Sequence, residues 1–335
     1  MDTSRVDAQV SAAIRAIETE DATPAEKVEM LMEIAMGIQQ RPRTPADLAQ
    51  ALVLYRHALE LCPADAPLLT ARVRACLATA LLAAPGGGTD SLEAARDALE
   101  QAIPALKQQG LPEEVAEAEM NLGLALQSLA GAGRGRITDS IAAYQRALRV
   151  FDRAAHPKEF AILQNNLATA FLAIPMTDER ARMREALAVQ SFEEGLKVVT
   201  LIDHPVEYAM LQNNLGNALQ YASSSHAVEN NLRALEAYDE ALRVRTPATA
   251  ALPYANTIAN KANCLLNLPD DPARPAFGNR ANLKQAQAYL DEARAIFLEH
   301  GEIEKARLVA ETLQQVVREL LAAADNGGGR AEAVA

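Results

Sequence analysis

The polar feature of the sequence that most suggests chemistry is a set of asparagines at one recurring position. It comprises Asn121, Asn166, Asn214 and Asn260, and a second set three residues further on comprises Asn217 and Asn263. Residues three apart lie on the same face of a helix. Asparagine is a poor helix-interior residue, so four in register indicate a shared role. A carboxamide donates and accepts hydrogen bonds, so these side chains suit either a bound peptide backbone or bonding between neighbouring helices. The sequence alone leaves both interpretations open.

Charged side chains accompany the first asparagine segments. Arg72 and Arg74 lie one period before Glu117 and Glu119. Arginine pairs well with planar carboxylates, so an acidic peptide end could dock near Arg72. The alternative is an Arg–Glu ion pair between neighbouring helices, which contributes roughly 0–1 kcal/mol at a partly exposed site. The second interpretation is favoured.

Other chemistries lack the residue patterns that they need. His156-Pro157 and His204-Pro205 recur at the repeat interval, but no CxxC, HExxH or close His/Cys pair supports a metal site. GAGRG at 131–135 lacks the phosphate-loop pattern, and GxSxG does not occur. We therefore expect no catalytic residue, no metal and no cofactor, and enzymatic activity is not the favoured function.

A long internal repeat positions the asparagines. HPKEFAILQNNLATAF at 156–171 recurs as HPVEYAMLQNNLGNAL at 204–219, and weaker copies start at Pro67, Pro112 and Pro253. Their aligned core positions are separated by 45 to 48 residues and are Leu77, Leu122, Leu167, Leu215 and Lys261. A second block, such as YQRALRV at 144–150 and YDEALRV at 238–244, shows the spacing of one buried helix face. Each period is therefore predicted to be helix A, a loop and helix B.

The predicted organisation follows from this period. Residues 1–23 form an N-terminal helix, residues 24–301 form about six antiparallel helix pairs, and residues 302–323 form a closing helix. The tail 324–335, with its GGG run, is expected to be disordered.

Composition agrees with an all-α fold. Half of the 335 residues are apolar, mostly Ala and Leu, whereas aromatics make up 4%. Strands need more β-branched and aromatic residues, which disfavours an all-β fold. A net charge of −12 disfavours binding to nucleic acid or to an anionic membrane. Three cysteines and the lack of a signal peptide or an apolar run of membrane-spanning length predict a cytoplasmic protein.

The repeated residues resemble the tetratricopeptide repeat. Its Leu-Gly pair in helix A is matched by Leu122-Gly123 and Leu215-Gly216, and its small–bulky–small pattern in helix B by Ala234-Tyr238-Ala241. The segment QNNLGNAL is similar to the sequences of long-period bacterial repeats, some of which accompany caspase-like CHAT domains. The period is longer than in the family, and the helix-A tryptophan is replaced, for example by Gln164 and Gln212.

This resemblance implies a right-handed α-solenoid whose A helices line a concave groove. It places the asparagines, together with Arg72 and Arg74, in a peptide-binding track. The expected function is thus a non-catalytic scaffold or adaptor for a protein or peptide partner of unknown identity. The alternatives are a small-molecule sensor or enzyme built in the solenoid, and a regulatory partner of a separately encoded effector such as a protease. Self-association also stays open.

Overall fold

The computed structural model describes residues 3–331 apart from 43, 85, 176–178 and 223–225; it also leaves undescribed the side chains of residues 3–9, 45, 179 and 323–331. Within the described residues the chain forms fourteen α-helices, one short 3₁₀ helix and no strand. This confirms the predicted all-α fold. The chain divides into two compact units, Met1–His156 and Pro157–Ala335.

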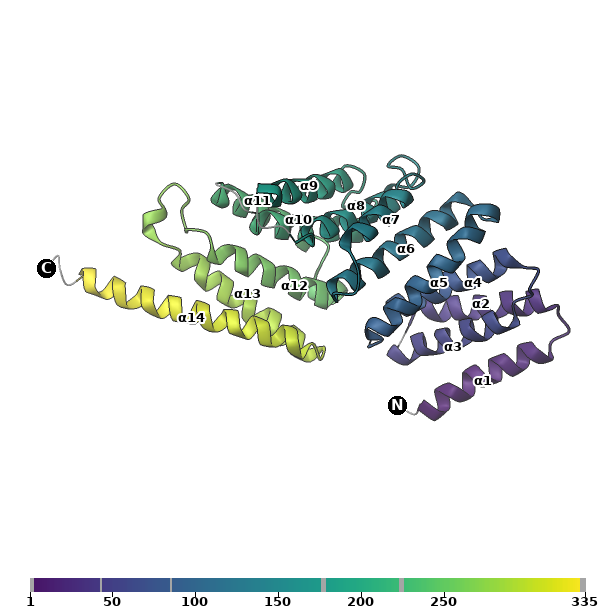
Figure 1. The fold of residues 1–335 in the computed structure, drawn as a ribbon. Coiled ribbons are helices and arrows are strands. Elements are labelled where there is room, and N and C mark those ends of the chain that lie inside the picture. Colours follow the sequence, from purple (N-terminus) through teal and green to yellow (C-terminus); the bar gives the residue numbers. More distant parts are fainter. Residues whose placement is uncertain (1–2, 43, 85, 176–178, 223–225, 332–335) are drawn as a thin grey trace. The chain divides into compact units, whose positions relative to one another are not determined.

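The first unit consists of an N-terminal helix and three helix pairs. Its helices are α1 (Thr3–Thr19), α2 (Pro24–Gln40), α3 (Pro45–Leu61), α4 (Pro67–Ala83), α5 (Gly88–Gln109), α6 (Pro112–Gly131) and α7 (Ile137–Ala147). Each even-numbered helix packs mainly against the next one, which gives the pairs α2/α3, α4/α5 and α6/α7. Within this unit the pairs follow one another in chain order, as in a solenoid (Figure 1).

The second unit consists of three helix pairs and a closing helix. Its elements are α8 (Pro157–Leu172), α9 (Glu179–Leu196), α10 (Pro205–Gln220), α11 (Ala227–Leu242), α12 (Pro247–Leu266), the 3₁₀ helix η1 (Pro275–Phe277), α13 (Arg280–Glu299) and α14 (Ile303–Ala331). The pairs are α8/α9, α10/α11 and α12/α13, and α14 packs along α13. Together with the first unit, the described residues hold the six pairs that the sequence predicts.

Proline and capping residues start most of the A helices. Proline occupies the first turn of α4, α6 and α10, where its missing N–H costs no helical hydrogen bond. Thr23 and Glu26 cap α2 reciprocally: the Thr23 N–H donates to Glu26 Oε2 at 2.7 Å, and the Glu26 N–H donates to Thr23 Oγ1 at 3.3 Å. Pro253 differs from its expected place, because α12 begins at Pro247 and kinks at Ala250 before it.

Small residues on the A helices let the B helices approach closely. Gly123 of α6 packs against the ring of Tyr144, and Gly216 of α10 packs against the ring of Tyr238. Both tyrosines are fully buried. Each hydroxyl has an acceptor on a glutamine one turn after the glycine: the Tyr144 hydroxyl donates to Gln127 at 2.8 Å, and the Tyr238 hydroxyl lies 2.8 Å from Gln220 Oε1. The predicted small–bulky–small pattern therefore forms the core of these pairs.

Lys261 stands where the other A helices carry a core leucine, and the structure shows how the charge is accommodated. Its Nζ pairs with Asp239 of α11 and lies 5.4 Å from the ring centroid of Tyr289 on α13. The side chain as a whole is buried. The methylenes fill the core while the ammonium group reaches a carboxylate and an aromatic face.

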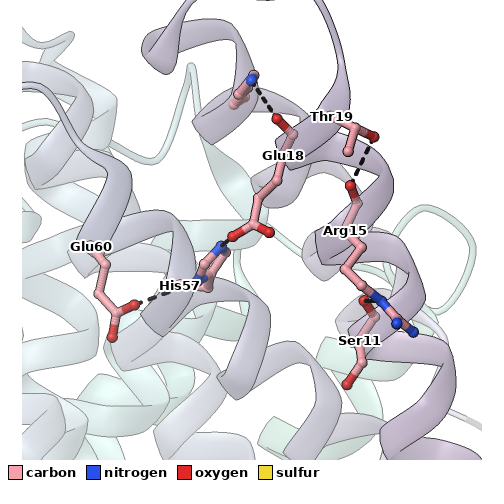
Figure 2. Close-up of polar contacts among 7 residues, drawn as sticks. Ser11, Arg15, Glu18, Thr19, His57 and Glu60 are labelled. Carbon is pink, nitrogen blue, oxygen red and sulfur yellow. Dashed lines mark hydrogen bonds and ion pairs between the residues drawn. The ribbon is translucent and has the colours of Figure 1, made fainter.

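Helix α1 covers the first pair of the first unit. Val10 and Ile17 of α1 are buried in the core of the first unit, and Ile14 of α1 packs beside them. Figure 2 shows the polar part of this contact, where His57 of α3 lies between two carboxylates. Its Nε2 is 3.1 Å from Glu18 Oε1 on α1, and its Nδ1 is 3.4 Å from Glu60 Oε2. An apolar stripe and this polar contact together hold α1 in place.

The closing helix α14 is longer than the predicted segment 302–323. Its backbone is helical through Ala331, which includes part of the segment expected to be disordered, and residues 332–335 lie outside the described residues. The disorder expected of the tail in solution stays a prediction. No helix in the described part of the chain combines the length and the apolarity needed to cross a membrane.

Candidate functional site

The A helices α2, α4 and α6 of the first unit line a pocket of about 260 Å³, which we call pocket 1. Arg72 and Asn121, two residues of the predicted groove, are in its wall. The remaining lining residues are Met32, Met36, Ala75, Cys76, Thr79, Leu106, Glu114, Glu117 and Ala118. The structure therefore brings part of the predicted track together on one A-helix face.

Arg72 is held by a carboxylate of the next A helix. Its Nε donates to Glu114 Oε1 at 2.7 Å, and its Nη2 donates to Glu114 Oε2 at 3.2 Å. The Arg72 guanidinium is the main reason that the pKa of Glu114 lies below its usual value. The favoured interpretation, an Arg–Glu pair between neighbouring helices, describes this contact, in which Glu114 supplies the carboxylate. An acidic peptide end at Arg72 would have to compete with Glu114.

Glu119 belongs to the interior of the helix stack. Its side chain is 3% exposed, and its carboxylate accepts hydrogen bonds from Lys107 of α5 at 3.0 Å and from Arg146 of α7 at 2.7 Å. Burial raises the pKa of Glu119, but the bonds from Arg146 and Lys107 outweigh burial and leave the pKa lowered.

Arg74 is half-buried on α4. Burial raises the pKa of the Cys62 thiol, and the Thr70 hydroxyl and the Arg74 charge offset only part of this rise.

Two polar side chains that line pocket 1 connect α4 with α6. Asn121 Nδ2 donates to Thr79 Oγ1 at 3.1 Å, so the amide is paired with a hydroxyl of α4. Beside it, burial and then the charges of Glu117 and Glu114 raise the pKa of Cys76 to about 11. The thiol is therefore protonated at neutral pH and forms part of the apolar wall.

In the second unit the asparagines form one directional chain of hydrogen bonds across α8, α10 and α12. Asn260 Nδ2 donates to Asn213 Oδ1 at 3.4 Å, and Asn213 Nδ2 donates to Asn214 Oδ1 at 3.0 Å. Asn214 Nδ2 then donates to Asn165 Oδ1 at 2.7 Å, and Asn165 Nδ2 donates to Asn166 Oδ1 at 3.3 Å. We call these five residues the amide chain. Its bonds are those expected for amides that connect neighbouring helices.

The two ends of the amide chain differ. At the α12 end Thr257 Oγ1 lies 3.1 Å from Asn213 Oδ1 and 2.9 Å from the Pro253 carbonyl oxygen, so these two acceptors share its one hydroxyl hydrogen, and Arg245 Nη1 donates to Thr257 Oγ1 at 2.9 Å. At the α8 end the Asn166 side chain is 8% exposed, and its Nδ2 is buried with no hydrogen-bond partner among the described residues. The amide chain therefore ends, at α8, in an unused donor.

The two asparagines of the second predicted set occupy different settings. Asn217 Oδ1 lies 2.7 Å from the Tyr238 hydroxyl inside the α10/α11 pair, where it and Gln220 Oε1 share the one hydroxyl hydrogen. Asn263 and Asn260 line a smaller pocket of about 170 Å³ between α12, α13 and α14, together with Lys305 and Leu308. The assignment of these asparagines to a peptide groove stays a prediction.

The described residues also bear on metal and thiol chemistry. No group of three or more His, Cys, Asp and Glu side chains among them has the arrangement needed to hold a metal ion. Cys62, Cys76 and Cys264 are free thiols. Burial raises the pKa of Cys264 to about 12, so this thiol is also a protonated core residue at neutral pH.

Several site residues could not be predicted from the asparagine pattern. Met32, Met36 and Glu114 complete pocket 1, and the first asparagine of each Asn-Asn pair, Asn165 and Asn213, accepts the bond from the next helix in the amide chain. The doubling in QNNL was the signal for the latter, because one amide alone cannot continue a chain along a helix and across to the next. Pocket 1 required the relative placement of three helices.

The fold and its pairwise packing define a helical-repeat protein with solenoid-like stacking inside each unit. No protein-family model and no curated protein sequence matches the chain. Among solved structures, BtubC from P. vanneervenii is similar over 73% of this chain and 91% of its own, with 20% identity and a TM-score of 0.48. A Rap protein complexed with Competence and Sporulation Factor is similar over 89% of this chain and 81% of its own, with 13% identity and a TM-score of 0.43. The TPR2AB domain of yeast Sti1, in a complex with pHSP90, is similar over 87% of this chain and 99% of its own, with 15% identity and a TM-score of 0.31.

Proposed function

We propose that this protein is a non-catalytic binding scaffold that holds a segment of a protein partner on the A-helix face of its first unit. Pocket 1 is the observation that carries the proposal. Three successive A helices contribute to it, so a ligand lying across them would contact α2, α4 and α6 at once. Repeat stacks of this kind offer extended surfaces on which successive helices each contribute a few side chains.

The lining of pocket 1 suits protein recognition. Met36 is 37% exposed at its edge and Met32 lies beside it, and methionine side chains adapt to differently shaped apolar partners. The Arg72–Glu114 pair and the Asn121–Thr79 bond place polar groups next to this apolar wall. Apolar anchors surrounded by fixed polar groups are the usual composition of binding sites.

Site-specific photo-crosslinking tests this function. A photoreactive amino acid replaces Met36 in the pocket or, as the control, exposed Ala94 on α5, and the full chain is irradiated in its native cells. We expect a covalent protein adduct at position 36 that position 94 does not form. Ala75→Leu, which fills pocket 1 from α4, should abolish the adduct while far-UV circular dichroism stays unchanged. An adduct at 36 that persists in the Ala75→Leu chain would contradict a role for pocket 1.

The proposed place of action is the cytoplasm. The three thiols are free, and protonated core cysteines such as Cys264 suit a reducing compartment. Association with a CHAT-type effector, suggested by the resemblance of the repeats, would be one form of the same scaffold function.

A further inference from the structure

We propose that helix α14 is an interaction surface for a second copy of this chain, and that the two α14 helices pair in antiparallel orientation. This inference goes beyond the scaffold function and does not depend on pocket 1. An exposed stripe along α14 provides the contact surface, and the charges beside the stripe determine the direction of the pair.

Helix α14 has two apolar sides, and only one of them faces the rest of the second unit, where α14 packs along α13 (Figure 1). Val309 and Val316 are buried in the core cluster that α14 shares with α13. Val317 follows Val316 directly, which turns it by about 100° around the helix axis, and Leu321 lies one turn further on. Val317 and Leu321 are 37% and 63% exposed. A second apolar helix face would remove them from water and gain their burial.

The exposed side of α14 has the residue spacing of a contact between two helices. Intervals of four, three and four residues separate its members, which we call the α14 stripe: Ala310, Gln314, Val317 and Leu321. In an antiparallel pair centred between residues 315 and 316, Ala310 of one copy lies opposite Leu321 of the other. Gln314 likewise lies opposite Val317. A small residue opposite a large one lets two helices interdigitate, and one stripe supplies both halves of the contact.

The charges beside the α14 stripe are unevenly paired within one chain. Glu311 and Arg318 each directly follow a stripe residue, so they lie on the same side of it. Arg307 serves two carboxylates: its Nη1 lies 2.5 Å from Glu311 Oε1, and its Nε lies 3.1 Å from Glu304 Oε2. Arg318 donates its Nε to the Gln314 carbonyl oxygen at 3.3 Å, and no carboxylate of the described residues pairs with it. One end of the stripe therefore has an excess carboxylate and the other an unmatched guanidinium.

The antiparallel pair brings these opposite charges together. When Ala310 lies opposite Leu321, Glu311 of one copy faces Arg318 of the other, and the two-fold symmetry repeats the contact. Charges that flank the contact between two helices set partner choice and orientation. A second copy supplies the matching stripe and the matching order of charges by symmetry, so it is the partner that this surface fits.

Charge exchange tests the inference. Sedimentation of the full chain is compared with that of Glu311→Arg and Arg318→Glu over a range of protein concentrations. We expect the wild type to approach twice the monomer mass as its concentration rises. Each single variant should raise the dissociation constant about tenfold or more, because the symmetric pair then contains two contacts between like charges. An equal mixture of the two variants should associate as tightly as the wild type, since every flanking charge again faces an opposite one.

Two further variants complete this experiment. Leu321→Glu places a charge within the α14 stripe and should abolish the dimer. Gln315→Arg adds a charge to an exposed position of α14 that faces away from the stripe, so it should leave the dissociation constant unchanged. Far-UV circular dichroism of each variant monitors the helical content, which should match that of the wild type.

The outcomes that would overturn the inference are distinct. A wild-type chain that stays monomeric at every concentration shows that α14 does not bind a second copy. A dimer that Leu321→Glu leaves intact forms through another surface. If both charge variants weaken the dimer but their mixture does not restore it, the antiparallel pairing of Glu311 with Arg318 is wrong.

Discussion

At the scale of single residues, the closest approach between helices depends on two glycines. A Cβ atom added to Gly216 would lie 2.6 Å from Cε1 of Tyr238, a ring that is fully buried. Gly123 and Tyr144 repeat this arrangement in the first unit. Because a buried aromatic ring has no room to retreat in a packed interior, these positions require the absence of a side chain.

Gly216→Ala should therefore destabilise the protein by about 1–3 kcal/mol, the usual cost of forcing extra volume into a packed core. Gly37→Ala is the matched control, since Gly37 also lies within an A helix but has nothing within 4 Å of an added Cβ. In Gly37→Ala the higher helix propensity of alanine should raise the free energy of unfolding of the protein by about 0.5–1 kcal/mol. Denaturant unfolding of both variants measures the difference. Equal effects at the two positions would refute the packing argument.

The buried tyrosines have hydroxyl partners that the spacing of the repeat does not indicate. Tyr144 and Tyr238 begin two of the predicted buried blocks. The structure gives both of them, and Tyr55 of α3, a glutamine acceptor on the preceding A helix: Gln127, Gln220 and Gln39. In α8/α9 the corresponding residues are Leu172 and Phe192, both apolar. Hydroxyl and amide thus occur together or not at all. Comparing the repeats with one another could have found these pairs, because a buried hydroxyl needs a partner.

At the scale of helices, the period predicted which residues share a position but not which of them bond. The four asparagines in register were assigned correctly to the A helices, and both interpretations of their role were compatible with that register. The bonds depend on how closely α8, α10 and α12 approach one another and on the first asparagine of each Asn-Asn pair. In the second unit Asn165 and Asn213 receive the donors from the next helix. In the first unit Thr79 takes the place of such an amide.

The direction of the amide chain gives a testable asymmetry between Asn214 and Asn166. Asn214→Ala removes the donor to Asn165 and the acceptor for Asn213, which leaves two buried amides short of a partner. We expect a loss of about 1–3 kcal/mol in unfolding free energy. Asn166→Ala removes one acceptor together with a donor that is already unused, so its loss should be smaller.

Urea unfolding of the two single variants, followed by far-UV circular dichroism, compares them directly. The wild-type-like helical signal of each folded variant serves as the control for gross misfolding. An Asn166→Ala variant less stable than Asn214→Ala would contradict the order of donors and acceptors in the amide chain.

At the scale of the whole molecule, the repeat period predicted the fold class and the number of helix pairs, because both follow from local periodicity. The division at His156/Pro157 was not predicted, since the period continues through it with the same HP motif that recurs at His204. Whether consecutive pairs share a core depends on contacts that the period does not encode. One core cluster extends from Val10 to Ala143, and two others lie between Ala161 and Val316.

Each unit should therefore fold without the other. Fragments 1–156 and 157–335 both fall in the usual size range of a domain and keep their own core clusters intact. We expect each purified fragment to be helical and to unfold cooperatively on heating, as followed by far-UV circular dichroism. The control division, 1–131 and 132–335, separates α6 from α7 and removes Tyr144 from its place against Gly123. Fragment 1–131 should consequently melt at a lower temperature or without cooperativity. If fragment 1–156 is unstructured alone and gains helix only when 157–335 is added, the first unit depends on the second for its stability and the independence of the two cores is wrong.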